Sequence, residues 1–192
     1  MDEVWYVSYG SNMSRARLLC YLQGGCPPGA RRTYPGARDR RPPRASVPAH
    51  LPGRIYFSGE SATWGGGMAF YDHDLPGPTP ARAYRVTVAQ FADIAAQEMR
   101  REPAAGTALE QVLTAGFTGI RHRTGPGRYE TLVHAGERDG LAMLTFTSPD
   151  GAAATAHTVP SSAYLAMLAE GLREGHGWAD EQIAAYLDSV LP

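Results

Sequence analysis

The start of the chain places a strand, a glycine turn and a helix directly after one another, and this junction constrains the fold most strongly. Residues 4–8 are mainly aromatic or β-branched, which predicts a strand. The helical pattern of residues 14–22 begins shortly afterwards. Between the two lies a short polar loop made of Tyr9, Gly10, Ser11 and Asn12.

This loop is a candidate anion-binding site. A strand-to-helix junction points several backbone N–H groups into one small volume at the positive end of a helix. A carboxylate, or an oxyanion that forms during a reaction, would be bound well there. The alternative is an ordinary turn, in which Gly10 supplies conformational freedom and Ser11 or Asn12 caps the helix.

The second feature is a helix that carries an acid on its apolar face. Thr87 and Gln90 form the capping box that opens it. Glu98 lies at helical spacing from Phe91 and Ile94, so we expect it on the inward face, where loss of water raises the pKa of a carboxylate. That is how a proton-transfer catalyst is tuned. Alternatively, Glu98 pairs with an arginine at the rim of the core. The other side of the helix is expected to hold Asp93, Gln97 and Arg100.

A third segment lies near the C-terminus. Pro160 and Ser161 precede Tyr164 and Leu165, and the helical pattern that follows contains Gly171. Together with the loop and the acid, this segment makes the chain resemble the γ-glutamylcyclotransferase-like (AIG2-like) superfamily. Its members carry a Tyr-Gly-Ser-Asn loop near the N-terminus and a catalytic Glu, often within Gln-Glu-Gly, near mid-chain. Many of them end in a Pro-Ser-x-x-Tyr-(x)-Leu helix with an internal Gly.

The resemblance extends over the whole chain, with two departures. The loop at residues 9–12 agrees without a change, and Gln97-Glu98 agrees with the acid position. Met99, however, stands where many relatives have Gly. Relatives also often place an aromatic residue on a later strand as a wall of the pocket. Phe146 is the nearest candidate for it here, and it lacks a hydroxyl.

The resemblance implies an α+β fold: a small, mixed, mainly antiparallel β-barrel or sheet with packed helices. It also implies a transferase or lyase that cleaves a γ-glutamyl amide. The substrate's α-amine attacks its own γ-carbonyl, which releases 5-oxoproline and an amine or amino acid, and closing a ring within one molecule saves orientational entropy. Glu98 would be the general acid/base. The substrate would be bound by Tyr9, Gly10, Ser11 and Asn12.

The remaining pattern agrees with a single α+β domain that spans residues 1–192. Many short strands with few helices favour an antiparallel sheet or barrel with helices packed outside it. The expected strands are residues 54–58, 68–71, 81–86, 129–135 and 141–147. A short helix is expected near residues 109–113, and two helices close the chain at residues 162–174 and 180–190.

Composition narrows the possible functions. The chain has 192 residues, of which 43% are hydrophobic, so it can bury one sizeable core. A net charge of −1 gives no reason to expect nucleic acid or an anionic membrane as a partner. No apolar run is long enough to span a membrane and no signal peptide opens the chain, so we expect a cytoplasmic protein in which Cys20 and Cys26 are free thiols. The histidines have no metal-binding spacing, and no cofactor is implied.

The arginines between Arg31 and Arg44 form the one strong charge bias of the chain. Their simplest interpretation is a solvated loop stiffened by proline. Two functional interpretations are a subsite for an anionic part of the substrate and a docking patch for an acidic partner protein.

Two other classes of function compete with the cyclotransferase. One is an amide hydrolase or acyltransferase of a specialised biosynthetic pathway, which would release free glutamate or a transferred acyl product. The other is a non-catalytic module whose pocket binds an acidic small molecule.

Overall fold

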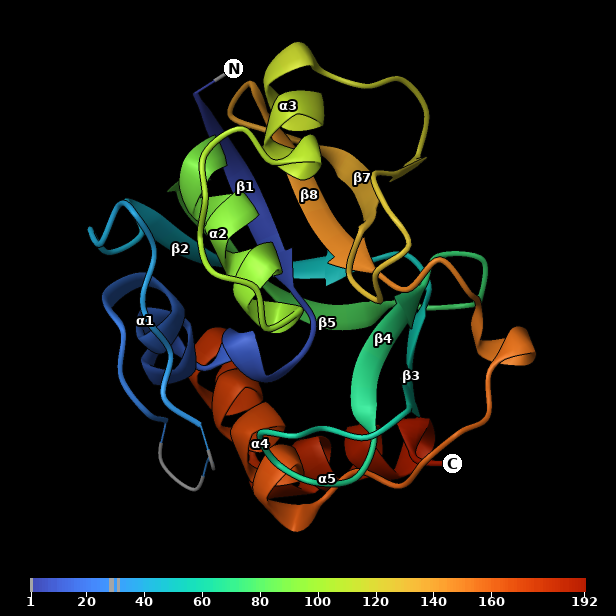
Figure 1. Ribbon diagram of the computed structural model, residues 1–192. Coiled ribbons are helices and arrows are strands. Elements are labelled where there is room, and N and C mark those ends of the chain that lie inside the picture. Colours follow the sequence, from blue (N-terminus) through green and yellow to red (C-terminus); the bar gives the residue numbers. More distant parts are fainter. Residues whose placement is uncertain (1, 28–29, 31) are drawn as a thin grey trace.

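The computed structural model describes residues 2–27, 30 and 32–192, and its main element is a six-stranded sheet (Figure 1). The strands lie in the order β2-β5-β1-β8-β7-β6. Their bounds are β1 Glu3–Ser8, β2 Ala45–Leu51, β5 Thr79–Thr87, β6 Arg121–Arg123, β7 Thr131–Arg138 and β8 Leu141–Thr147. A separate two-stranded ribbon consists of β3 (Arg54–Ser58) and β4 (Met68–Asp72).

Strand β1 lies inside the sheet and determines its mixed character. It pairs antiparallel with β5 and parallel with β8, and the other neighbouring strands pair antiparallel. The order begins with β2 and ends with β6, so the sheet is open and does not close into a barrel. The expectation of a mainly antiparallel α+β architecture is confirmed, in the form of an open sheet.

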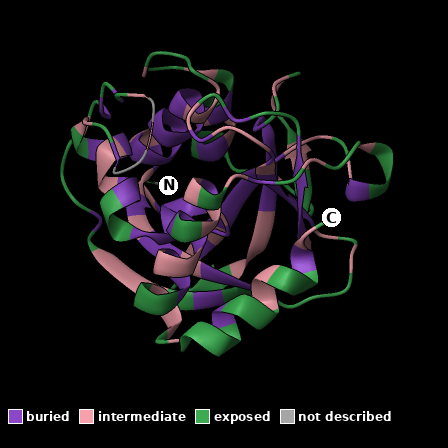
Figure 2. Cartoon of the chain, turned by 90° about the horizontal axis from the view of Figure 1, so that it is seen from below, coloured by how far each residue is buried: buried purple, intermediate pink, exposed green. Residues whose placement is uncertain are grey.

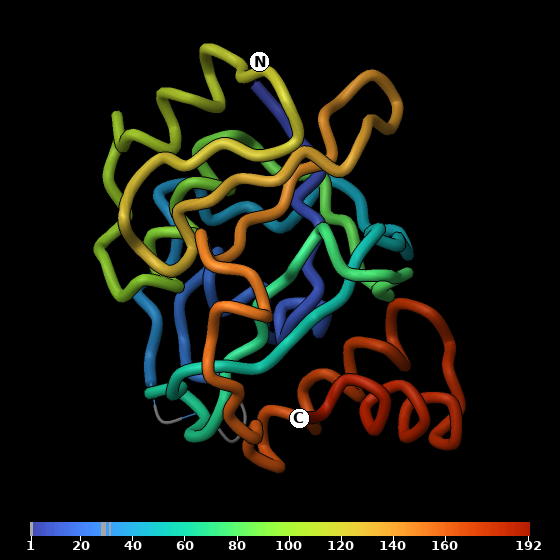
Figure 3. Tube along the Cα trace, turned by 90° about the vertical axis from the view of Figure 1, so that its right-hand side faces the viewer, coloured from blue at the N-terminus to red at the C-terminus, as the bar shows by residue number. Residues whose placement is uncertain are grey.

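Five helices pack around the sheet. They are α1 (Arg15–Gln23), α2 (Val88–Glu98), α3 (Ala108–Ala115), α4 (Ser162–His176) and α5 (Asp180–Val190). Two single 3-10 turns, η1 (Ser11–Met13) and η2 (Ala152–Ala154), complete the described elements. Helix α3 lies at the end of the molecule opposite the C-terminal pair α4 and α5, as two perpendicular views show (Figures 1 and 3).

Both faces of the sheet are buried at β1, which explains why its residues 4–7 are all hydrophobic. Val4 and Tyr6 belong to one cluster of buried side chains, which includes residues of α1 and α2. Trp5 and Val7 point the other way, into a second cluster with residues of α4 and α5. The buried residues accordingly gather inside the molecule, while the exposed ones lie on the outer helices and loops (Figure 2).

The sequence predicted most elements to within a few residues but missed two strands. Strand β2 contains Pro48, which lacks the N–H that a central strand needs. The structure places β2 at an edge of the sheet, where a proline is tolerated. Strand β6 has three residues and lies at the opposite edge.

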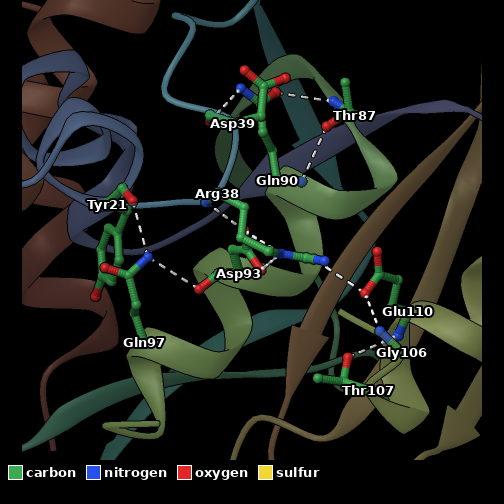
Figure 4. Close-up of polar contacts among 10 residues, drawn as sticks. All are labelled: Tyr21, Arg38, Asp39, Thr87, Gln90, Asp93, Gln97, Gly106, Thr107 and Glu110. Atoms are coloured by element: carbon green, nitrogen blue, oxygen red, sulfur yellow. Dashed lines mark hydrogen bonds and ion pairs between the residues drawn. The ribbon is translucent and has the colours of Figure 1, made fainter. Parts of the chain in front are cut away.

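Helix α2 begins at the predicted capping box. The Thr87 hydroxyl accepts a hydrogen bond from the Gln90 backbone N–H (3.1 Å), and the Gln90 side chain accepts one from the Thr87 N–H (3.0 Å). On the other side of this helix, Asp93 and Gln97 are buried as well. The segment around Arg38 covers them (Figure 4).

The arginine-rich segment is a strap that holds α2 in place. Arg38 donates to both carboxylate oxygens of Asp93 through Nε (2.9 and 3.0 Å) and to Glu110 of α3 through Nη2 (3.1 Å; Figure 4). Burial raises the pKa of Asp93, although Arg38 opposes this shift. Arg40 donates to backbone carbonyl oxygens, and Arg41 pairs with Asp39. Arg38, Arg40 and Arg41 are themselves exposed, as the solvated-loop interpretation expects, and Arg38 in addition ties the loop to α2 and α3. Arg31 lies outside the described residues.

We expect Arg38→Met to lower the free energy of unfolding by about 2–3 kcal/mol, because it leaves the buried Asp93 carboxylate without its guanidinium partner. Chemical denaturation measures the change. Arg41→Met is the control, since its ion pair with Asp39 is exposed and its loss should not be detectable. Equal losses in the two variants would contradict a structural role that is specific to Arg38.

Candidate functional site

The five residues predicted for the site line one cavity of about 220 Å³. Its walls come from the end of β1, the end of α2, residues 61–64 and the first turn of α4. The predicted residues among them are Tyr9, Gly10, Ser11, Asn12 and Glu98. Ligand pockets for drug-sized molecules measure roughly 300–1,000 Å³, so this one suits a smaller molecule.

A hydrogen bond joins the loop to the acid. Asn12 Nδ2 donates to Glu98 Oε1 (3.0 Å) and to the Tyr6 hydroxyl (3.1 Å). The first bond connects residues 86 positions apart in the chain. In the described part of the chain, no arginine forms an ion pair with Glu98. Among these described residues the alternative of a Glu–Arg pair at the rim of the core is not found, and a neutral amide hydrogen-bonds the carboxylate.

The turn after β1 differs from the expected direct entry into a helix. Gly10 is extended and precedes η1, and the Met13 N–H donates to the Gly10 carbonyl oxygen (3.0 Å). Ser14 then caps α1 and accepts a hydrogen bond from the Arg17 N–H. The cap is thus Ser14 rather than Ser11 or Asn12, and both of those residues line the cavity instead.

Tyrosines form much of the cavity wall. Burial, reinforced by the negative charge of Glu98, raises the pKa of Tyr164 to about 12, although the backbone groups of Ala69 and Ser11 oppose this. Burial likewise raises the pKa of Tyr6, Tyr9 and Tyr129. These hydroxyls therefore stay protonated at neutral pH and can donate hydrogen bonds.

Phe146 lies in this wall, as the sequence suggested. Its ring stacks on Tyr6, with centroids 5.3 Å apart and an angle of 13° between the planes. The Tyr9 hydroxyl donates to the Phe146 carbonyl oxygen (2.9 Å), which fixes the side chain of the loop's first residue against β8. Phe146 contributes shape, while Tyr34 and Tyr164 are among the residues that bring hydroxyl groups to the cavity.

Among the charged residues of the site that the sequence analysis missed, Arg17 of α1 is the buried one. It lines the cavity and is only 2% exposed. Its Nη2 donates to the hydroxyls of Tyr21 (2.6 Å) and Tyr34 (2.8 Å), and its guanidinium carbon lies 4.3 and 4.4 Å from the two ring centroids. The spacing of Arg17 and Tyr21, four residues apart on a helix, was a local signal for the first contact. The contact with Tyr34 is made across a loop and left no local signal.

Helix α4 approaches the turn closely at Gly171. A Cβ atom at Gly171 would lie 2.5 Å from Met13 Cβ and 2.8 Å from the Ser14 nitrogen, so only glycine fits there. Tyr164, from the same helix, brings its hydroxyl within 3.1 Å of the place where a Cβ of Gly10 would be. The helix therefore supports the loop from behind and also contributes to the cavity.

We expect Gly171→Ala to lower the free energy of unfolding by roughly 2–3 kcal/mol, because the methyl group forces α4 away from η1. Gly175→Ala on the same helix is the control. Its Cβ would lie 3.5 Å from the nearest atom, an Arg82 side-chain carbon, so the better helix propensity of Ala should leave stability unchanged or raise it by about 0.5 kcal/mol. Thermal unfolding of both variants measures the difference. Similar behaviour of the two would show that α4 is not tightly held against the loop.

Two further properties bear on the kind of site. In the described part of the chain, no group of three or more His, Cys, Asp or Glu side chains is arranged to hold a metal ion. Among the same residues, no helix is long and apolar enough to cross a membrane.

Comparisons with known proteins give one sequence match and a set of structural ones. No family model matches the chain. It is 32% identical over 205 residues to Histone deacetylase 5 of Arabidopsis thaliana, in a match that covers 98% of this chain and 31% of that protein. The chain thus spans about a third of the length of this curated relative.

Among solved structures, a gamma-glutamyl cyclotransferase superposes with a TM-score of 0.57 at 15% identity, covering 99% of this chain and 89% of that one. An uncharacterized protein from Homo sapiens gives a TM-score of 0.57 at 16% identity, with 100% and 90% covered. The chain therefore has the γ-glutamylcyclotransferase-like fold, and the expectation from the sequence is confirmed for the fold.

Proposed function

We propose that this protein is a γ-glutamylcyclotransferase-like enzyme that releases 5-oxoproline from a small γ-glutamyl amide. The observation that carries the proposal is the pair of Asn12 and Glu98, which holds a carboxylate at the wall of a small cavity beside the Tyr-Gly-Ser-Asn loop. The γ-glutamylcyclotransferase-like fold supports a reaction of this type. The fold alone does not name the substrate, because unrelated functions share folds.

In the proposed reaction, Glu98 first takes a proton from the α-ammonium group of the substrate, because only the free amine is a nucleophile. The α-amine nitrogen then attacks the γ-carbonyl carbon, and a five-membered ring closes. As the tetrahedral intermediate collapses, the bond from this carbon to the amide nitrogen breaks. Glu98 returns its proton to the leaving nitrogen. The ring nitrogen, which still carries two hydrogens, gives up one of them to the Glu98 carboxylate, which passes it to the departing amine. An ammonium product and 5-oxoproline are thereby released.

The surrounding groups have complementary tasks. Asn12 holds one oxygen of Glu98, which leaves the other free to face the substrate. Backbone N–H groups of Gly10 and Ser11 would stabilise the oxyanion that develops on the γ-carbonyl oxygen. The protonated hydroxyl of Tyr164 lies beside the same loop and can donate to this oxyanion or to the substrate.

Product analysis tests the proposal against its rivals. The purified protein is incubated with a panel of γ-glutamyl amines and dipeptides in ¹⁸O-labelled water, and the products are identified by mass spectrometry. Cyclisation yields 5-oxoproline without ¹⁸O, whereas an amide hydrolase yields glutamate with one ¹⁸O atom. Binding without either product would favour the non-catalytic module.

Glu98→Gln should lower turnover on the order of 100-fold or more while leaving the thermal midpoint unchanged. The amide keeps the volume and still accepts the hydrogen bond from Asn12, but it cannot transfer a proton. Steady-state rates of 5-oxoproline release measure the effect. Glu102→Gln is a matched control, because Glu102 is exposed and does not line the cavity. Near-normal turnover in a folded Glu98→Gln protein would remove Glu98 from the mechanism.

Activity should survive thiol-blocking reagents and chelators. Cys20 and Cys26 do not line the cavity, and Cys26 is the exposed one. Turnover is measured after treatment with iodoacetamide and, separately, with a chelator. Loss of activity that a Cys26→Ser variant resists would implicate the thiol, and loss to a chelator that a divalent metal restores would overturn the proposed mechanism.

A further inference from the structure

Arg17 is a buried cation whose polar contacts are incomplete. Only its Nη2 is satisfied, by the hydroxyls of Tyr21 and Tyr34. Its Nε and Nη1 atoms are buried and have no hydrogen-bond partner in the described part of the chain. Within that part, no carboxylate lies close enough to form an ion pair with it. The side chain therefore ends in the wall of the cavity with unused donors.

A purely structural role for Arg17 would leave its buried donors without hydrogen-bond partners. Burying a charge is costly unless it is paired and hydrogen-bonded, and each buried donor without a partner adds to the cost. Burial opposes the charge, but the hydroxyls of Tyr21 and Tyr34 and the carboxylate of Glu98 together raise the pKa of Arg17, so the guanidinium stays charged. Arg38 shows what a structural arginine looks like in this protein, because it has carboxylate partners in Asp93 and Glu110.

The charge around the cavity points in the same direction. Four arginines line it, and Glu98 is the one acid among the lining residues that the structure describes. The guanidinium carbon of Arg32 lies 5.3 Å from the centroid of the Tyr34 ring, and that of Arg17 lies 4.4 Å from the same centroid. Two guanidinium groups therefore share one aromatic side chain. A cavity with this excess of positive charge attracts an anion.

We propose that Arg17 is the anion subsite of the cavity and binds a carboxylate of the substrate through an N–H group that Tyr21 and Tyr34 leave unused. A hydrogen bond from a charged guanidinium group to a carboxylate is charge-assisted, which makes it stronger than a bond between neutral groups. The identification of the bound group as part of a γ-glutamyl substrate rests on the proposed function. That a carboxylate binds at Arg17 rests on the unused donors and the charge balance alone.

The cavity then has two anion-binding elements with different tasks, Arg17 and the backbone of the loop. If Arg17 holds the carboxylate, the backbone of Gly10 and Ser11 is left for the oxyanion. The carboxylate has two possible sources, the α-carboxylate of the γ-glutamyl group and a carboxylate on the leaving amino acid. Both would be recognised by the same chemistry, and binding experiments separate them.

The first experiment uses unreactive probes, so its result does not depend on turnover. Glutarate and its neutral diamide, glutaramide, are titrated into wild-type protein by calorimetry. We expect glutarate to bind at least about 10-fold more tightly, as a charged hydrogen-bonded pair requires. Arg17→Met should abolish this difference, and Arg17→Lys should keep part of it. Retention of the full preference in a folded Arg17→Met protein would overturn the proposal.

A control variant and a wild-type measurement protect the test from effects on folding. Arg40→Met removes an exposed arginine that contacts only backbone carbonyl oxygens, so it should keep the preference for glutarate. In wild-type protein, the Nε–H resonance of Arg17, assigned through its contacts to the rings of Tyr21 and Tyr34, should shift with glutarate and not with glutaramide. An unchanged resonance under saturating glutarate would overturn the proposal even if every Arg17 variant failed to fold.

The second experiment finds the source of the carboxylate. In the Glu98→Gln background, affinities are measured for three ligands, with and without Arg17→Met. The first is γ-glutamylalanine, the second is its C-terminal amide, which lacks the carboxylate of the leaving alanine, and the third lacks the α-carboxylate of the glutamyl group because a carboxamide replaces it. If Arg17 binds the α-carboxylate, the substitution weakens the first two ligands alike and spares the third. If it binds the leaving half, only the C-terminal amide is spared. Equal weakening of all three, or of none, would contradict carboxylate recognition by Arg17, whether or not wild-type protein proves to be a cyclotransferase.

Discussion

The hydrogen bond from Asn12 to Glu98 joins the turn after β1 to the end of α2, and each of these two segments is also held by contacts of its own. Strand β1 is paired on both edges and buried on both faces, so the position of its last residue is determined by the sheet. Helix α2 is anchored at its first turn by the capping box and along its side by Arg38. Because β1 and α2 are held in this way, the single hydrogen bond from Asn12 is enough to orient the Glu98 carboxylate. The cavity lies where the ends of β1 and α2 approach each other.

The features that could be predicted from the sequence are those with local causes. The capping box of Thr87 and Gln90 needs only residues three apart, and the apolar run of β1 needs only burial, so both were identified correctly. The γ-glutamylcyclotransferase-like fold followed from short motifs in the right order. Strand β2 was missed because a proline such as Pro48 is unfavourable in a strand unless the strand lies at an edge of the sheet. The position of β2 in the sheet is not visible in the local sequence.

The features that could not be predicted depend on contacts between distant segments. Asp93 looked like a residue of the helix's far side, yet it is buried because Arg38, from a loop 55 positions away, covers it. Arginines with different roles also look alike in the sequence. Arg38, Arg40 and Arg41 are bonded to acids or carbonyl oxygens, whereas the hydrogen bonds of Arg17 in the described part of the chain go to tyrosine hydroxyls. The sequence shows how many arginines there are, and only the fold shows which of them have acidic partners.

The open sheet has a consequence for how the chain behaves among other chains. A barrel has no free strand edges, but this sheet ends in β2 on one side and β6 on the other. Pro48 removes a backbone donor from the first edge, and β6 has only three residues, two of which are the charged Arg121 and Arg123. Both edges are thus poor templates for a further strand. The sheet is thus protected against edge-to-edge aggregation although it is open. The end of β1 can therefore form part of the cavity wall.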